Sequence, residues 1–301
     1  MNQSVQSVDD TPREVHVIEP SRGWMRIRWR ELWQYRELFG FLIWRDVKIK
    51  YKQTLLGAAW AVLVPLSQMA VFTILFQRVA NFSSDGLPGP LFYFAGLLPW
   101  NYFASSITQG SNSMVQNAPM LTKVYFPRLM VPATPCAAAF VDFAIAFAML
   151  IVLTFFYGIL PGVAWLLLPV FMVLACGAAY GAGSFLAALN VKYRDVRHII
   201  PFLVQIWMFL TVITPYSAVK EALGPWRYAY GLNPMAAVVE GVRWALFRHL
   251  SGMELIEGQP STVSASPPWE LFALGTVVTV LMLAVGLYYF KRMERTFADI
   301  V

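Results

Sequence analysis

The stretch 45–65, RDVKIKYKQTLLGAAWAVLVP, places a basic segment directly before a long apolar one. Arg45, Lys48, Lys50 and Lys52 fall within eight residues, and the chain that follows is apolar for about 25 residues. At 1.5 Å per residue, an apolar helix of this length crosses a hydrocarbon core of ~30 Å. Because Lys and Arg gather on the cytoplasmic side of membrane spans, this junction predicts a first crossing that starts inside the cell.

The composition is that of a polytopic membrane protein. Apolar residues make up 58% of the 301 residues and charged residues only 13%, against about 45–50% and 25% in soluble domains. The net charge of +6 is therefore interpreted by position along the chain, and no nucleic-acid partner is expected. Residues 1–23 contain no apolar core of a signal peptide, so we expect them to form a disordered cytoplasmic extension.

Six apolar segments predict an all-α membrane protein with six transmembrane helices. The six-span domain covers 55–301 and follows an amphipathic interface helix in 24–54. The predicted spans are 55–79, 91–110, 133–157, 163–189, 199–217 and 269–290. Of the 23 Lys and Arg residues, 18 fall on one side of these spans, which places both termini in the cytoplasm.

The segment before the first span has an apolar side. Its apolar side chains recur at helical spacing and comprise Leu32, Tyr35, Phe39, Leu42 and Ile43. A basic, tryptophan-rich helix of this kind is typical of one that lies in the membrane interface, although an ordinary solvated helix fits the same pattern.

The connection between spans five and six, 218–268, is the longest. Asn233 and Pro234 predict a helix start, with Asn as the N-cap and Pro in the first turn. The amphipathic helix that follows is expected either to lie on the outer surface or to dip back into the bundle. The segment 252–268 is rich in Ser, Thr, Pro and Gly and is expected to be a loop.

No catalytic or metal-binding constellation is recognisable. The chain has no G-x-x-x-x-G-K-[ST] motif for a nucleotide phosphate. His16 and His198 are expected on the cytoplasmic side and His249 on the outer side, so they cannot share a metal ion. We therefore predict no catalytic residues, no metal and no cofactor in this chain.

Asp142 is the one acidic residue well inside a predicted span. No basic residue in the spans offers it a partner, so it is expected either to accept hydrogen bonds from a neighbouring helix or to face a water-filled path. A single intramembrane acid gives little support to an ion-coupled transporter.

Several segments together resemble the permease subunit of type 2 ATP-binding cassette (ABC) exporters of the polysaccharide and polyol-phosphate family. That family includes O-antigen (lipopolysaccharide), capsule and teichoic-acid exporters. The segments that carry the resemblance are RDVKIKYKQTLLGAAWAVLVPL (45–66), LFYFAGLLPWNYFASSI (91–107), NAPMLTKVYFPRLMVP (117–132), LNVKYRDVRHIIPFLVQIWMFLTVITPYS (189–217) and GLNPMAAVVEGVR (231–243). They occur in order over about two-thirds of the chain.

The resemblance implies a homodimer around a central channel in the bacterial inner membrane, among membrane lipids, with two ATPase subunits from a separate chain. ATP and magnesium would be bound by those subunits. The substrate would be a polysaccharide on a polyprenyl diphosphate carrier. Short re-entrant helices would follow span five. The residues implied in coupling to the ATPase are Asn117, Met120, Leu121, Lys123, Tyr125, Phe126 and Arg128.

Two further groups of residues are candidates for contact with the substrate. Aromatic rings that can stack on sugar faces would line the channel at Tyr93, Phe94, Trp100, Tyr102, Phe103 and Tyr216. Cations that can bind the carrier diphosphate or lipid headgroups are Arg45, Lys48, Lys50, Lys52 and Arg194. Membrane-interface anchoring by aromatics and topology-setting cations are alternative interpretations of the same residues.

Two other functions remain open at this point. One is a type 2 ABC exporter of a drug or lipid, and the other is a membrane-embedded glycan-processing enzyme. The enzyme needs a convergent acid, base or metal group near one membrane face, which the sequence does not display.

Overall fold

The computed structural model describes residues 29–52, 59–121, 123–193, 195–256, 259–261 and 263–294. Three predictions fall outside these residues: the extension 1–23, the start of the first span at 55–58, and any role of Arg194.

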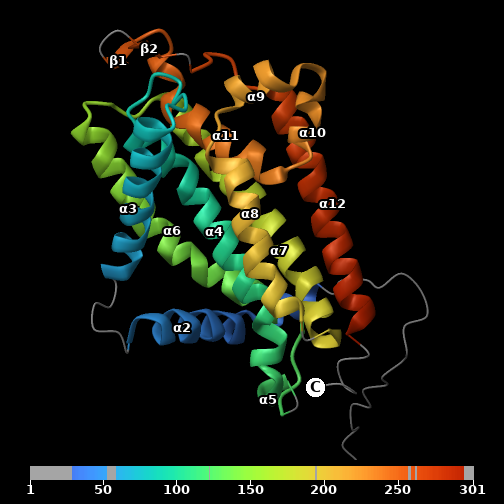
Figure 1. Ribbon diagram of the computed structural model, residues 1–301. Helices are drawn as coiled ribbons and strands as arrows, with labels where there is room; N and C mark the ends of the chain where they lie inside the picture. The colour runs from blue at the N-terminus through green and yellow to red at the C-terminus, as the bar shows by residue number, and fades with distance from the viewer. Residues whose placement is uncertain are drawn as a thin grey trace, which may run out of the picture.

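The molecule is a bundle of long helices with short elements at both ends (Figure 1). The long helices are α2 (Arg36–Lys52), α3 (Trp60–Phe72), α4 (Gly89–Gln116), α6 (Met130–Phe156), α7 (Leu168–Lys192), α8 (Val196–Val212) and α12 (Trp269–Met293). The short helices are α1 (Trp29–Gln34), α5 (Ala118–Leu121), α9 (Tyr216–Leu223), α10 (Arg227–Gly231) and α11 (Pro234–Phe247). A π-helix, Thr73–Val79, continues α3, and single 3₁₀ turns occupy Val163–Leu167, Gly224–Trp226 and Arg248–Leu250.

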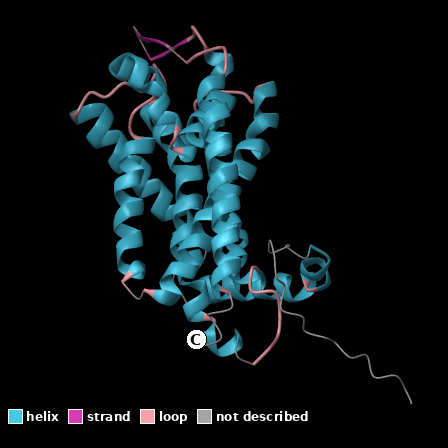
Figure 2. Ribbon diagram, turned by 90° about the vertical axis from the view of Figure 1, so that its right-hand side faces the viewer, coloured by secondary structure: helices cyan, strands magenta, loops and turns pink. Residues whose placement is uncertain are grey.

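Strands β1 (Glu254–Ile256) and β2 (Gln259–Pro260) form a short antiparallel hairpin. Figure 2 shows it beyond the ends of the long helices. The prediction of an unstructured loop over 252–268 is corrected to this extent. The strands are short and contribute little to a fold that is otherwise helical, as predicted.

Four stretches of the described chain are long and apolar enough to cross a membrane: Trp60–Val79, Met130–Phe156, Val163–Lys192 and Trp269–Met293. A fifth candidate joins α8 to the segment Tyr216–Gly231 through a bend of 87°. Helix α4 has 28 residues, about 42 Å at 1.5 Å per residue, but the amides and hydroxyls of its second half make it too polar to qualify. The count of six spans therefore stays a prediction.

Helix α4 lies at the centre of the bundle and packs against α3, α6, α7, α8 and α11. Close approach elsewhere depends on glycine: α7 and α12 pack tightly where Gly181 faces Leu283 and Gly286. A Cβ built on Gly181 would lie 2.7 Å from the backbone nitrogen of Leu283, so any side chain there would separate the two helices.

Helix α11 begins as predicted, since the Asn233 side chain accepts a hydrogen bond from the Met235 amide and Pro234 occupies the first turn. All fourteen residues of α11 are buried, so this helix packs inside the bundle and does not lie on its surface. It sits at the end of the bundle opposite α2 (Figure 1).

Helix α2 lies across the other end of the bundle, roughly perpendicular to the long helices (Figure 1). Leu42 from its apolar side is 2% exposed and packs with Met114, Phe126 and Phe290. Trp33, on α1, and Trp44 are exposed on the other side. The helix predicted before the first span is therefore present. It packs mainly against α6, and its apolar side also meets α4, the loop after α4, and α12.

Candidate translocation path and coupling loop

The second half of α4 presents a polar stripe. Residues on one side of this helix are exposed or half-buried in the single chain, whereas most of the rest of α4 is buried. The polar stripe consists of Asn101, Ser105, Thr108, Gln109, Asn112 and Gln116. Positions three or four apart share one face of a helix, so these groups follow one line along the bundle. Amides and hydroxyls are costly in hydrocarbon, so this line is suited to facing water or another polar surface.

A cleft of about 600 Å³ adjoins the stripe between α2, α3, α4 and α6, and we call it the α3–α6 cleft. Its inner wall carries the Asn101 side chain, which donates to Gln68 Oε1 over 2.7 Å, and Gln109, which donates to Ser105 Oγ over 2.6 Å. Because each side-chain amide has two donor hydrogens and an acceptor oxygen, the wall retains capacity for further hydrogen bonds. The cleft can therefore hold a molecule with both apolar and polar surfaces.

Asp142, on α6, lines the α3–α6 cleft and has partners from α2. Its carboxylate is paired with the Lys50 ammonium and accepts a hydrogen bond from the Tyr51 hydroxyl. The expectation that Asp142 accepts a hydrogen bond from a neighbouring helix is confirmed, and the basic partner that the spans lack is Lys50. The partner comes from the interface helix, outside the spans, and only the crossing of α2 beneath α6 brings the two together. Burial, with the neighbouring carboxylate, raises the pKa of Tyr51, which keeps this hydroxyl a hydrogen-bond donor.

The predicted carrier-binding cations separate into two kinds. Lys48 and Lys52 are exposed on α2, whereas Lys50 is paired at the mouth of the α3–α6 cleft. Arg45 is turned toward the protein and binds Asp46 and Asn117. Lys48, Lys50 and Lys52 thus lie on one turn and a half of α2, where a headgroup beside the bundle can reach them.

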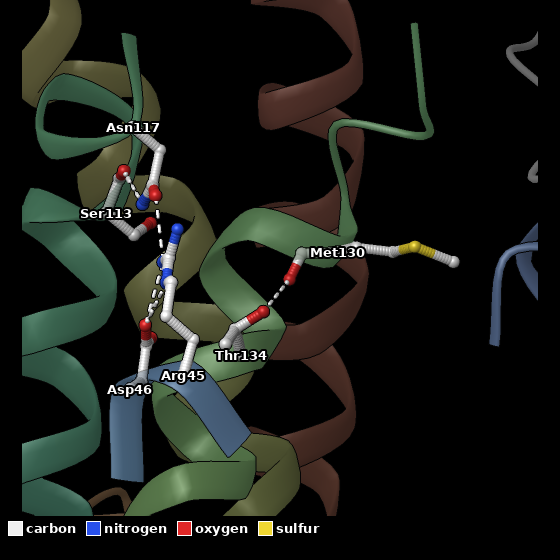
Figure 3. Close-up of polar contacts among 6 residues, drawn as sticks. All are labelled: Arg45, Asp46, Ser113, Asn117, Met130 and Thr134. Atoms are coloured by element: carbon white, nitrogen blue, oxygen red, sulfur yellow. Dashed lines mark hydrogen bonds and ion pairs between the residues drawn. The ribbon is translucent and has the colours of Figure 1, made fainter. Parts of the chain in front are cut away.

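The Arg45 cluster (Arg45, Asp46, Ser113 and Asn117) joins α2 to the end of α4 (Figure 3). Arg45 Nη2 donates to Asp46 Oδ1 over 2.7 Å and to Asn117 Oδ1 over 2.9 Å. Asn117 in turn donates through Nδ2 to the carbonyl oxygen of Ser113 over 2.8 Å. Asn117 caps the C-terminus of α4, so the cluster fixes the point where the loop 117–128 begins.

The rest of that loop contacts three other elements. The Tyr125 hydroxyl donates to Glu31 on α1 over 3.2 Å, and Arg128 Nη1 donates to the carbonyl oxygen of Glu294, just beyond α12, over 2.6 Å. Phe126 is 3% exposed and packs beside Leu42. A displacement of this loop would consequently be transmitted to α1, α2, α4 and α12 together.

The remaining predicted coupling residues lie around the short helix α5, which projects beyond α2 (Figure 1). Met120 and Leu121 are half-buried against the cluster around Phe126, and Lys123 is exposed. Helix α5 itself is only one turn long. The seven residues thus lie in one loop with an anchored base, in which Lys123 and Tyr125 are exposed and Phe126 is buried.

Five of the six predicted channel aromatics do not face an open space in this chain, and the sixth, Tyr216, is half-buried on α9. Tyr93, Phe94, Trp100, Tyr102 and Phe103 are each at most 3% exposed. Trp100 and Phe103 pack edge-on against Trp207 of α8. Only Tyr102 borders the α3–α6 cleft. The reason is the central place of α4, whose first half is covered on all sides, so contact of these rings with sugar stays a prediction.

At the opposite end of the bundle, Arg243 of α11 is 4% exposed and holds several elements together. Its guanidinium donates to Glu240 Oε1 over 2.8 Å, to the Phe92 carbonyl over 3.3 Å and to the Val212 carbonyl over 2.5 Å. It also lies 3.8 Å from the centre of the Phe92 ring. Gly96 leaves room for it, since a Cβ there would lie 2.5 Å from Arg243 Nη2.

Within the described residues, no three His, Cys, Asp or Glu side chains come together as a metal site requires. Long apolar helices, a polar line along the central helix and an anchored loop at one end define an integral membrane protein of the transport class. A profile of the ABC-2 type transporter family matches residues 37–247. The chain belongs to this family.

The chain is also similar to two curated proteins over most of its length. It is 30% identical to the O-antigen export system permease protein RfbA of Myxococcus xanthus, over 88% of this chain and 96% of that protein. It is 25% identical to the O-antigen export system permease protein RfbA of Klebsiella pneumoniae, over 85% of this chain and 92% of that protein. Family membership places the chain among transport subunits. It gives no support to the alternative that the chain is a membrane-embedded glycan-processing enzyme.

Proposed function

We propose that the chain is the channel-forming permease of an ATP-driven exporter that moves an O-antigen-type polysaccharide, attached to a polyprenyl diphosphate, across the bacterial inner membrane. In this proposal α3, α4, α6, α7, α8 and α12 are the six spans. The names of the relatives support the substrate class. The observation in the structure that carries the proposal is the polar stripe of α4.

A polysaccharide needs a passage with many exchangeable hydrogen bonds and no tight binding site. Amide and hydroxyl side chains meet this need because they both donate and accept. The polar stripe runs from Asn101 to Gln116 on one helix, about 22 Å at 1.5 Å per residue, and contains no charged residue. An uncharged path of this length suits a polymer that slides and does not stop.

One copy of the chain leaves the polar stripe open on one side, so a second copy is needed to close the passage. A homodimer with a two-fold axis along the passage would place the same stripe on both walls, because such an interface uses identical surfaces. This requirement supports the predicted homodimer.

The α2 end of the bundle would face the cytoplasm, where the positive residues gather. The loop 117–128 would then project toward two ATPase subunits, which bind ATP and magnesium. Lys48, Lys50 and Lys52 would meet the diphosphate of the carrier as it enters beside α2, with Arg194 a further candidate. Arg45 would contribute through the Arg45 cluster instead, since its guanidinium is occupied by protein groups.

The test replaces the stripe with apolar residues of similar size, as in the triple variant Asn101→Leu, Ser105→Val and Thr108→Val. We expect loss of surface polysaccharide, with carrier-linked glycan accumulating on the cytoplasmic side. The matched control keeps the stripe polar through Asn101→Gln, Ser105→Thr and Thr108→Ser, and should retain most export. Membrane levels of both variants are measured by immunoblot.

A normal amount of surface polysaccharide in the apolar variant would show that the polar stripe does not line the translocation path. Normal surface polysaccharide in a strain that lacks the chain altogether would favour the second candidate, a type 2 exporter of a drug or lipid.

A further inference from the structure

A second cleft lies at the end of the bundle opposite α2. It has a volume of about 470 Å³ and is bounded by α9, α11, the loop before α4 and the segment that leads into α12. We call it the α11 cleft. We propose that the α11 cleft binds a sugar unit of the exported polymer after that unit has left the membrane. This proposal rests on the proposed function and adds to it a binding site on the outer face.

Aromatic rings form much of the wall of the α11 cleft. Tyr216 of α9, Trp244 of α11 and Trp269 at the start of α12 all line it. Trp269 is 70% exposed, so one face of its indole is open to a ligand. Ligand sites combine apolar, often aromatic walls with a few placed polar groups, and the C–H faces of sugar rings pack well on such walls.

Trp244 carries a polar group that the described protein does not satisfy. The side chain is buried, with 6% of the residue exposed, and its indole Nε1 has no hydrogen-bond partner among the described residues. Buried donors are nearly always paired in folded proteins, so the wall of the cleft contains a donor for which the described protein supplies no acceptor. A hydroxyl or ring oxygen of a sugar provides such an acceptor.

The polar rim suits neutral sugar hydroxyls. Its members are Asp85, Ser217, Lys220, Ser264, Ser266 and Glu270. The Ser217 hydroxyl donates to Asp85 over 2.6 Å, and Glu270 is paired with Arg227 over 3.2 Å. The rim therefore offers hydrogen-bond donors and acceptors, and it contains both positive and negative side chains. Its charge does not select a strongly anionic or cationic ligand.

The position of the α11 cleft gives the site a role in transport. Its walls come from α9, which follows the 87° bend after α8, and from α11, which Arg243 fixes to α4. A sugar held between them would bridge a fixed helix and a helix beyond a bend. Each bound unit would oppose backward sliding of the polymer while the next unit crosses.

The test is a binding measurement on the permease purified with its ATPase in lipid nanodiscs. The probe is the polymer from the native strain, released from its carrier by mild acid. The decisive variant is Trp269→Ala, and its matched control is Trp226→Ala, a residue that is 75% exposed but lies outside the cleft. We expect Trp269→Ala to weaken binding about tenfold, as truncation of an aromatic anchor does, and Trp226→Ala to leave it unchanged.

A second variant, Trp244→Phe, keeps an aromatic ring in the wall and removes the unpaired N–H. It should weaken binding about fivefold, the effect of one lost hydrogen bond. If wild type and all three variants bind equally, or if wild type does not bind, the α11 cleft is not a sugar site. A separate measurement, the amount of surface polysaccharide in a strain that lacks the chain, tests the proposed function. If that amount falls while the α11 cleft shows no binding, the chain is still an exporter and only the sugar site is ruled out.

Discussion

Each end of α4 is held by an arginine from another helix, but the two arginines have different surroundings. Arg243 is 4% exposed, contacts two backbone carbonyls besides Glu240, and lies on an aromatic ring. The Arg45 side chain is 31% exposed and, among the described residues, binds two side chains, those of Asp46 and Asn117. The α11 end is thus built as a fixed attachment. The α2 end is built as a contact that can rearrange, which suits an end that receives the stroke of an ATPase.

The largest expected effect follows from removal of the fixed attachment. Arg243→Met leaves the Glu240 carboxylate buried without its cation and leaves the carbonyls of Phe92 and Val212 without their donor. Breaking a buried ion pair in this way costs about 3–5 kcal/mol. We expect a strong loss of folded protein after detergent extraction and a lower unfolding temperature.

The matched control for that prediction is Arg227→Met, which removes an arginine from an ion pair with the half-exposed Glu270. Exposed pairs contribute little to stability, so this variant should extract and unfold like wild type. Equal behaviour of the two variants would show that Arg243 does not fix α11 to α4.

The second-largest effect concerns the loop 117–128 at the α2 end, and it changes export and ATPase stimulation rather than stability. The double charge reversal Lys123→Glu and Arg128→Glu changes the exposed face of the loop and removes the contact of Arg128 with the Glu294 carbonyl. We expect the protein to insert normally but to lose stimulation of its partner ATPase and export of polysaccharide. ATP hydrolysis by the reconstituted complex, with and without the carrier-linked glycan, measures this. Full stimulation by the variant would remove the loop from the coupling path.

A smaller effect is expected from Asn117→Ala. This change removes one charge-assisted hydrogen bond to Arg45 and the side-chain cap of α4, about 1–2 kcal/mol together. The unfolding temperature should fall by a few degrees, and coupling should weaken without being lost. Val115→Ala is a suitable control, since Val115 lies two residues earlier on α4, is 47% exposed and is not part of the polar stripe. If Asn117→Ala matches this control in ATPase stimulation, the Arg45 cluster serves stability alone.

Much of the architecture was predictable because it depends on local pattern. The start of α11 at Asn233 and Pro234 and the helix before the first span follow from residues that are neighbours in sequence. The partner of Asp142 could not be predicted in this way, since Lys50 lies 92 residues earlier on an element outside the spans. The same holds for Arg243, whose carbonyl acceptors lie on α4 and at the end of α8.

The polar stripe teaches a different lesson, because its signal was present in the sequence. Asn101, Ser105, Thr108 and Asn112 are spaced four, three and four residues apart, which places them on one face of a helix. The aromatic residues just before them are larger and more numerous, and they suggested a channel wall. In the folded chain those rings fill the core, and the smaller polar groups take the open side.

The smallest predicted effect depends on pH and concerns His249, in the 3₁₀ turn after α11. Its ring packs beside Gly162, and neither ring nitrogen has a hydrogen-bond partner among the described residues. Loss of water around the ring lowers the pKa of His249. The folded state therefore binds the proton less readily than the unfolded state, so this histidine lowers stability as the pH falls through its ordinary value of about 6.5.

Accordingly, the unfolding temperature should decrease slightly between pH 7.5 and pH 5.5, and His249→Gln should reduce that decrease. Differential scanning fluorimetry at several pH values measures both. A pH dependence that survives His249→Gln would have to arise from another titratable group, and Glu240, the buried carboxylate paired with Arg243 on α11, is the first to replace.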